Sequence, residues 1–174
     1  MKRLFELDAR LSARLRVAEK PGKRRRLAII FGHSGDSWFW LGGLMLVAWL
    51  GGETWRPLAL SLLTGILLTA LVVLLIKFSV RRQRPEGEWG QVYRRADPHS
   101  FPSGHAARAL MLALVALGLG PVWFGWLLLA WAPFVGLARV ATGLHYISDV
   151  LAGWIVGLLL GLVTLQVVGV IGLV

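Results

Sequence analysis

The chain has 174 residues, a length that suits one domain, and 56% of them are hydrophobic, with nine Trp. A mean hydropathy of +0.66 is too high for a soluble core and predicts an integral membrane protein. The sequence contains no Cys, which excludes disulfides and thiolate metal sites. Nineteen Lys and Arg against nine Asp and Glu give a formal net charge of +10.

The first 26 residues form a basic amphipathic segment. Lys and Arg occupy many positions of this segment. The apolar residues between them recur at helical spacing: Leu4, Phe5, Leu7, Leu11, Leu15 and Val17. This pattern is typical of a helix that lies on a membrane surface, and we expect such a helix over residues 1–20. The segment has no continuous apolar stretch, so we do not expect a cleavable signal peptide. The next apolar run, LAIIFGH at 27–33, is too short to span a membrane.

Five longer apolar runs alternate with polar breaks after residue 33. Because a transmembrane helix needs about 20 apolar residues, we predict spans, the first of them short, over 38–50, 57–76, 103–119, 122–137 and 150–174. The count rises to six if the N-terminal helix or the run 27–33 belongs to a further span. The sequence thus predicts an all-α bundle of five to six transmembrane helices over 27–174, preceded by an interfacial segment over 1–26.

Three glycines repeat every four residues on the last predicted span: Gly153, Gly157 and Gly161. Small residues at this spacing let two helix backbones approach closely. We expect the glycines to pack within the bundle, although the same pattern also fits the seam of a homo-oligomer.

Polar residues close to a membrane are costly and often functional. Lys77 follows the second predicted span, and Arg84 lies seven residues further on, two helical turns away and on the same helical face. This spacing fits joint binding of one anion. We interpret four neighbouring arginines as interfacial cations whose charged ends reach water: Arg81, Arg82, Arg94 and Arg95.

The stretch HSFPSGHAAR at 99–108 leads into the third predicted span. Pro102 suits the first turn of a helix and Ser103 its polar start, so the free N–H groups of this helix would bind an anion. Gly104 has no side chain to hold a ligand away, and His105 can exchange a proton near neutral pH.

The third polar group is ARVATGLHYISDV at 138–150. Arg139 is a further cation, and the i, i+4 spacing of His145 and Asp149 lets the carboxylate fix the ring tautomer and leave the other nitrogen free to attack. A His held by a carboxylate also suits a metal ligand, but three cations nearby favour an anion. Because successive spans alternate in direction, the three polar groups lie on one membrane face, where they describe a phosphate site with a nucleophile and an acid.

Three segments resemble, in order, the signature motifs of the type 2 phosphatidic acid phosphatase (PAP2) family: KFSVRRQRP at 77–85, PSGH at 102–105 and RVATGLHYISD at 139–149. The family includes lipid phosphate phosphatases, undecaprenyl diphosphate phosphatases and vanadium haloperoxidases. SFPSGHAARA and the upstream HSGDSWFW are most similar to small members that act on polyisoprenoid diphosphates, such as presqualene diphosphate phosphatase.

The resemblance implies roles for individual residues. His145 would be the nucleophile that forms a phosphohistidine, Asp149 its orienting partner, and His105 the acid that protonates the leaving oxygen. The resemblance implies that five residues bind the phosphate: Lys77, Arg84, Arg139, Ser103 and Gly104. Gly104 would do so through its backbone. One position departs from the family pattern, because Ala138 stands where the third motif usually begins with Ser.

The implied activity is removal of phosphate from a lipid phosphate or diphosphate, without a metal or other cofactor. Polyisoprenoid diphosphate, phosphatidic acid and phosphatidylglycerophosphate all fit the pattern. A catalytically silent lipid-phosphate-binding protein and a transporter with a basic vestibule are the alternatives. We expect membrane lipids and the lipid phosphate as partners, and no nucleic acid.

The distribution of charge predicts an orientation in the membrane. In the five-span order, 18 of the 19 Lys and Arg fall on the face that carries the site, and only Arg56 falls on the other. Short basic segments stay in the cytoplasm. We therefore predict an inner-membrane protein whose site faces the cytoplasm.

Overall fold

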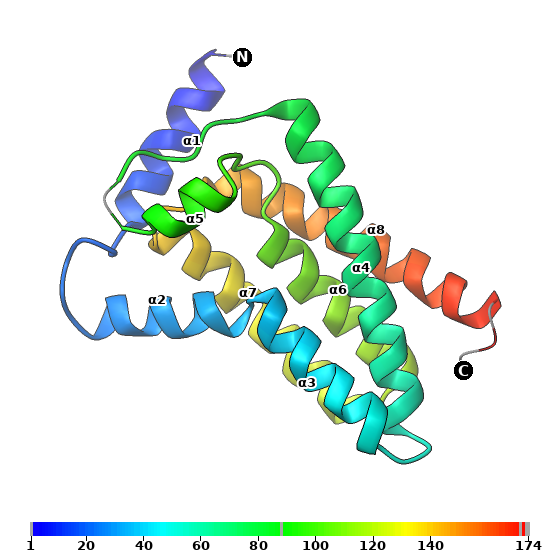
Figure 1. Cartoon of the computed structure of the whole chain (residues 1–174). Coiled ribbons are helices and arrows are strands. Elements are labelled where there is room, and N and C mark those ends of the chain that lie inside the picture. Colours follow the sequence, from blue (N-terminus) through cyan, green and yellow to red (C-terminus); the bar gives the residue numbers. More distant parts are fainter. Residues whose placement is uncertain (1, 88, 171, 173–174) are drawn as a thin grey trace.

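The computed structural model describes residues 2–87, 89–170 and 172, which fold into eight helices (Figure 1). In chain order they are α1 (Lys2–Leu15), α2 (Lys23–Ser34), α3 (Ser37–Leu50), α4 (Trp55–Val80), α5 (Gln91–Ala96), α6 (Gly104–Leu119), α7 (Val122–Ala141) and α8 (Ile147–Val170). Helices α3, α4, α6, α7 and α8 correspond to the five predicted spans. The last predicted span, 150–174, ends outside the described residues.

The described helices carry the apolar surface of a membrane protein. Helices α4, α7 and α8 are long and apolar enough to cross a membrane, and α3 and α6 are shorter apolar helices. Large apolar side chains are exposed on the outer faces of α4 and α8, among them Leu67, Leu71, Leu75, Ile155, Leu159 and Leu162. Such surfaces suit lipid and not water. The chain is a membrane protein, and the predicted all-α membrane fold is confirmed.

Helices α4 and α7 are each at least four residues longer than the predicted spans 57–76 and 122–137. Helix α4 begins at Trp55, two residues early, because a proline in the first helical turn, here Pro57, removes no intrahelical hydrogen bond. Helix α7 continues beyond residue 137 to Ala141 and so contains Arg139 in its last turn. The polar Arg139 marked the end of the apolar run in the sequence, but its side chain is buried in the structure.

Helix α6 is the centre of the bundle. It packs against α4, α7 and α8, while α3 packs on α4 and α2 packs on α7. Its buried side chains are small or flexible and include Ala109, Met111, Leu112, Val115 and Ala116. The end of α4 and the start of α6 lie at one end of the bundle, near α1 and α5, and the turn between α3 and α4 lies at the other (Figure 1). This alternation of direction brings the three polar groups together, as predicted.

The three glycines of α8 face α6. A Cβ atom on Gly157 would lie 2.2 Å from the carbonyl oxygen of Ala107, and one on Gly153 would lie 2.5 Å from that of Ser103. No side chain fits in either space. The prediction that the glycines pack within the bundle is confirmed.

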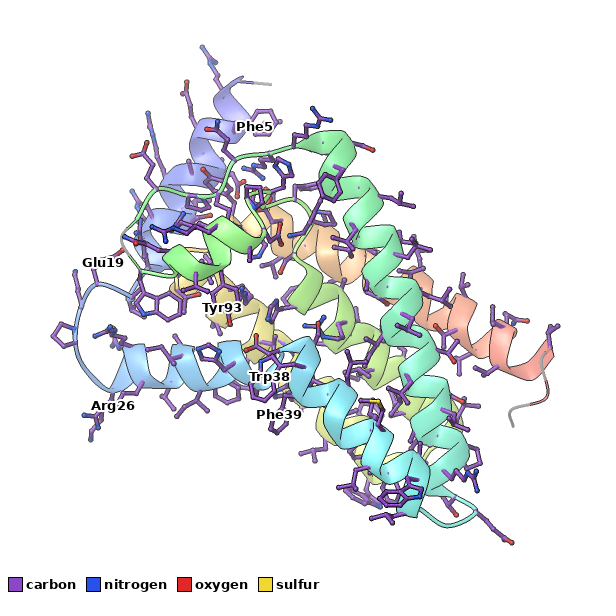
Figure 2. The ribbon with its side chains drawn as sticks, in the orientation of Figure 1. Phe5, Glu19, Arg26, Trp38, Phe39 and Tyr93 are labelled. Carbon is purple, nitrogen blue, oxygen red and sulfur yellow. The ribbon has the colours of Figure 1, made fainter. Side chains whose placement is uncertain are left out.

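Helix α1 ends at Leu15, five residues before the predicted end. Its polar face docks on the start of α8, where Ser12 Oγ accepts the N–H of Ile147 at 2.9 Å. Its large apolar side chains are exposed: Leu4, Phe5, Leu7 and Leu11. Figure 2 shows Phe5 near the N-terminal end of this helix. Leu4, Leu7 and Leu11 lie on a face apart from the docked one, whereas Phe5 lies on the docked side, where the Arg82 guanidinium is 5.5 Å from the centre of its ring.

Candidate active site

A pocket of about 250 Å³ opens where α4, α6 and α7 meet the loop that leads into α8. Six of the eight predicted site residues line it: Lys77, Arg84, Gly104, His105, Arg139 and His145. Asp149 and Ser103 are fully buried and do not line the pocket. The pocket is therefore rich in cations and has two histidines on its wall.

His145 presents Nε2 to the cations. The Nη1 group of Arg84 donates to His145 Nε2 at 3.0 Å, so Nε2 is the unprotonated nitrogen and Nδ1 carries the proton. Burial lowers the pKa of His145 well below its usual range, and the nearby cations Arg84, Arg139 and Lys77 lower it further. The imidazole is thus neutral at neutral pH, and the electron pair of Nε2 accepts the Arg84 hydrogen bond, which must give way before Nε2 can attack a substrate.

The relation between His145 and Asp149 differs from the prediction in one respect. His145 lies two residues before α8 begins, so the pair does not share a helical face. The Nδ1 to Oδ2 distance of 3.7 Å is in ion-pair range but longer than a hydrogen bond. Oδ2 instead accepts the N–H of Tyr146 at 2.8 Å. Asp149 therefore faces the protonated nitrogen from behind the ring while it also holds the backbone at the start of α8.

Arg82 fixes the carboxylate of Asp149. Its Nη1 donates to Asp149 Oδ1 at 2.7 Å and to Ser148 Oγ at 2.6 Å, and its Nη2 donates to Asp8 Oδ2 at 2.7 Å. The guanidinium also lies 4.0 Å from the centre of the Tyr146 ring. The interpretation of Arg82 as an interfacial cation is therefore wrong, because this side chain joins α1 and α8 behind the site.

Lys77 and Arg84 converge on one carboxylate. Lys77 donates to Asp97 Oδ2, and Arg84 donates to the same oxygen from Nη2 at 2.9 Å. The convergence does not come from a shared helical face, because α4 ends at Val80 and Arg81 takes a left-handed conformation. Arg84 reaches the site from the loop beyond. The two cations thus meet at one carboxylate oxygen of the protein, along a different backbone path from the predicted one, and their joint binding of a phosphate stays a prediction.

Arg139 is a buried cation without an acidic partner among the described residues. It is 2% exposed, and its guanidinium lies 4.8 Å from the centre of the Tyr93 ring, which projects from α5 (Figure 2). Its Nε finds no hydrogen-bond partner in the described part of the chain. A buried cation of this kind is costly unless an anion joins it.

The start of α6 carries Ser103 and His105. Ser103 Oγ accepts the N–H of Ala106 at 3.4 Å and caps the helix, and the Ser103 N–H donates to the carbonyl of Asp149 at 2.9 Å. Both groups of Ser103 are therefore engaged within the protein, and its predicted contact with phosphate stays a prediction. Gly104 borders the pocket directly.

His105 has a carboxylate partner that sequence reasoning missed. His105 Nε2 lies 2.8 Å from Asp36 Oδ1, and Asp36 also contacts His33 Nδ1 at 2.9 Å and the Tyr93 hydroxyl at 3.1 Å. Burial alone would raise the pKa of the Asp36 carboxyl, but hydrogen bonds from His105 and His33 outweigh burial and hold that pKa well below its usual range. Asp36 lies within HSGDSWFW, yet nothing in that stretch points to a residue 69 positions away.

The donor set does not resemble a metal centre. Among the residues that the structure describes, no three His, Asp or Glu side chains gather closely enough to hold a metal ion. The pocket instead combines cations with a neutral histidine, a set that favours a phosphate group.

Comparison with protein families decides the relationship. The model of the PAP2 superfamily matches residues 58–172, more than half of the chain. The chain belongs to the PAP2 superfamily. The matched region includes all eight predicted site residues but neither α1 nor Asp36.

Two relatives with assigned names align with about two thirds of the chain. A lipid A 1-phosphatase from Porphyromonas gingivalis is 31% identical over 112 residues, which are 63% of this chain and 23% of the relative. An undecaprenyl-diphosphatase from Sulfolobus acidocaldarius is 26% identical over 115 residues, which are 64% of this chain and 56% of the relative. The chain thus spans about a quarter and about half of the lengths of these proteins.

Two solved PAP2 structures share the fold. The transmembrane PAP2 type phosphatidylglycerolphosphate phosphatase from Bacillus subtilis superposes with a TM-score of 0.75 at 23% identity, over 95% of this chain and 86% of that one. The Aquifex aeolicus LpxE superposes with a TM-score of 0.67 at 24% identity, over 92% of this chain and 95% of LpxE. These likenesses establish the helical arrangement of the PAP2 fold for this chain.

Proposed function

We propose that the protein is an integral membrane phosphatase that removes a phosphoryl group from a phosphorylated lipid through a phosphohistidine intermediate. The observation that carries the proposal is the position of His145 Nε2, which is unprotonated and faces a pocket that holds Lys77, Arg84 and Arg139. A neutral nucleophile surrounded by fixed cations suits attack on a phosphorus atom that carries negative oxygens.

In the first step, the Nε2 electron pair of His145 forms a bond to phosphorus. The bond from phosphorus to the leaving oxygen breaks, its electron pair stays on that oxygen, and His105 donates a proton to it. Phosphoryl oxygens replace the Asp97 carboxylate between Lys77 and Arg84, and Arg139 gains the anion that it lacks within the described chain. The positive charge that develops on the His145 ring is stabilised by Asp149 behind it.

In the second step, water attacks the phosphorus of the phosphohistidine. His105 accepts a proton from this water, the bond from phosphorus to Nε2 breaks, and its electron pair returns to His145. Charge on the transferred group is stabilised throughout by preorganised cations and the N–H groups at the start of α6, so the chemistry needs no metal ion.

We propose a lipid as the substrate because the pocket continues along the apolar side of α4. Beside the cations it is lined by Ala70, Val73 and Leu74, and the side chain of Leu74 is exposed on the outer surface of the helix. A headgroup phosphate among the cations would thus have its tail directed toward the membrane. The relatives named above are phosphatases of lipid A, undecaprenyl diphosphate and phosphatidylglycerolphosphate, which supports the same class of substrate.

We propose that residues 1–26 lie in the membrane interface and contact lipids, ahead of a catalytic domain over 27–174. The exposed apolar face of α1 supports this division, because an interfacial helix buries such a face among lipid headgroups.

We propose that the protein resides in the inner membrane with the site facing the cytoplasm. Ten Lys and Arg precede residue 27, six lie between 77 and 95, and Arg108 and Arg139 also belong to the site end, against Arg56 alone at the start of α4. Fifteen remain against one after Lys77, Arg84 and Arg139 are set aside. Short basic segments stay in the cytoplasm, which supports this orientation.

Release of phosphate by the purified protein tests the proposed activity. With a panel of phosphatidic acid, phosphatidylglycerophosphate and polyisoprenoid diphosphates, the wild type should release phosphate from at least one. His145→Ala should release none, and Asp149→Asn should keep a small remainder. His99→Ala is a matched control, because this ring packs against Phe78 and does not line the pocket. An active His145→Ala protein would refute the phosphohistidine, and an inactive wild type would favour a lipid-phosphate-binding protein or a transporter.

A further inference from the structure

The deep end of the pocket holds a fourth cation that the proposed chemistry does not use. Arg108 of α6 lines the pocket and is 7% exposed. Its Nη2 donates to the carbonyl of Gly35, but its Nε is buried and has no hydrogen-bond partner among the described residues. No described acid forms an ion pair with Arg108 either. A buried guanidinium with unmet donors is costly unless a ligand supplies acceptors.

A second unpartnered polar group lies on the facing helix. Thr69 of α4 lines the same pocket, is 1% exposed, and its hydroxyl has no partner within the described chain. Thr64 and Thr164 behave differently, because each donates to the carbonyl four residues earlier, at 2.9 and 2.7 Å. The Thr69 hydroxyl is therefore free to meet a ligand from inside the bundle.

The spacing along the helices sets where these two groups act. Arg108 follows His105 by three residues, so it shares a face of α6 and lies about 4.5 Å deeper in the bundle. Thr69 precedes Lys77 by eight residues and lies about 12 Å from it along α4. Both residues line the same pocket as Lys77 and His145, so they lie on the bundle side of a phosphate that His145 attacks.

We propose that Arg108 and Thr69 form a second anion subsite that binds the tail-proximal phosphate of a lipid diphosphate. The inference rests on the proposed phosphatase activity and names its substrate class. When the terminal phosphate of a diphosphate is attacked, the leaving group is the second phosphate, which carries the negative charge that Arg108 neutralises. A monophosphate would place an apolar methylene group beside this buried cation instead. The subsite thus favours diphosphates, because it stabilises their leaving group.

Two lipids with one tail and either one or two phosphates test the subsite. We would measure kcat/KM for the initial release of terminal phosphate from farnesyl diphosphate and from farnesyl phosphate in mixed micelles. Arg108→Gln should lower the diphosphate value about 10- to 100-fold, as expected for a lost hydrogen bond to a charged group, and leave the monophosphate value unchanged. Thr69→Val should shift the ratio in the same direction by less. Thr64→Val and Arg56→Gln are matched controls that should leave the ratio unchanged.

The outcomes separate the subsite from the activity. An equal loss on both lipids would assign Arg108 to holding Gly35 and overturn the subsite, while the phosphatase would stand. A wild type that hydrolyses neither lipid would overturn the proposed function. The subsite would then be judged by thermal stabilisation with inorganic diphosphate and phosphate, and an unchanged preference in Arg108→Gln would refute it. If Arg108→Gln fails to fold, Arg108→Lys and Thr69→Val decide in the same assays.

Discussion

Arg82 donates a hydrogen bond of 2.7 Å to Asp149 Oδ1 and thereby ties the loop after α4 to the first turn of α8. Asp149 is fully buried, and its other oxygen is engaged by the N–H of Tyr146. The orientation of the carboxylate behind His145 thus depends on a residue that does not line the pocket. We propose that Arg82 is a positioning residue.

We predict that Arg82→Gln lowers kcat about 10- to 100-fold, the usual effect of removing a partner that orients a functional side chain. KM should change little, because the cations that bind phosphate remain. Steady-state kinetics of phosphate release would separate the two constants, with the exposed neighbour Arg81 changed to Gln as the control. A rise in KM with kcat intact would contradict the positioning role.

Loss of the Asp36 carboxylate should lower the rate most for substrates whose leaving oxygen must be protonated. We predict that Asp36→Asn lowers the rate for an alkyl lipid phosphate about 10²-fold, at the low end of general acid catalysis, because His105 loses the carboxylate that orients it. An aryl phosphate such as p-nitrophenyl phosphate should be far less affected, since its phenolate leaves without protonation. Equal losses on both substrates would assign Asp36 a structural role only.

The pH dependence of kcat/KM should reflect the neutral His145. Its pKa lies below the usual value of about 6.5, so the unprotonated nucleophile persists as the pH falls through that value. We therefore predict that kcat/KM, which reports the free enzyme, keeps its value down to below pH ~6.5 after correction for ionisation of the substrate. An acidic limb centred at or above that pH would show that burial and the cations do not control His145.

Hydrolysis should survive treatment with EDTA, because the charge of the transferred group is stabilised by Lys77, Arg84 and Arg139. Vanadate and tungstate should inhibit by occupying the phosphate position, and inhibition should weaken in Arg139→Gln. Phosphate release with and without chelator, and titration with each oxyanion, would measure this. Strict dependence on added Mg²⁺ would point to a metal mechanism.

Cysteine labelling should reveal the orientation of the protein in the membrane. Because the chain has no native Cys, only the introduced residue can react. Gln91 and Glu53 are exposed near opposite ends of the bundle. In intact cells, Gln91→Cys should resist a membrane-impermeant maleimide and react after permeabilisation, and Glu53→Cys should react in intact cells. Labelling of Gln91→Cys in intact cells would reverse the proposed orientation.

The sequence predicts the candidate catalytic and phosphate-binding residues better than the residues that position their side chains. Lys77, His105 and His145 stand out because polar residues at the ends of apolar spans are few, and alternating spans bring them to one end. Arg82 and Asp36 could not be found this way, because their partners lie 67 and 69 positions away and no periodicity links them. Contacts between residues this far apart in the sequence depend on how the helices pack. Composition and spacing do not specify that packing.

The glycine contact between α6 and α8 has a mechanical consequence. At Gly157 the two backbones approach so closely that a Cβ atom would lie 2.2 Å from the carbonyl oxygen of Ala107. We expect this closely packed pair to act as a rigid frame that carries His105, Arg108 and Asp149. We expect any opening that admits a lipid tail to form on the other side of the pocket, where Leu74 of α4 is exposed. On this view the α6 and α8 pair keeps the site residues aligned, and α4 provides the side on which a lipid enters.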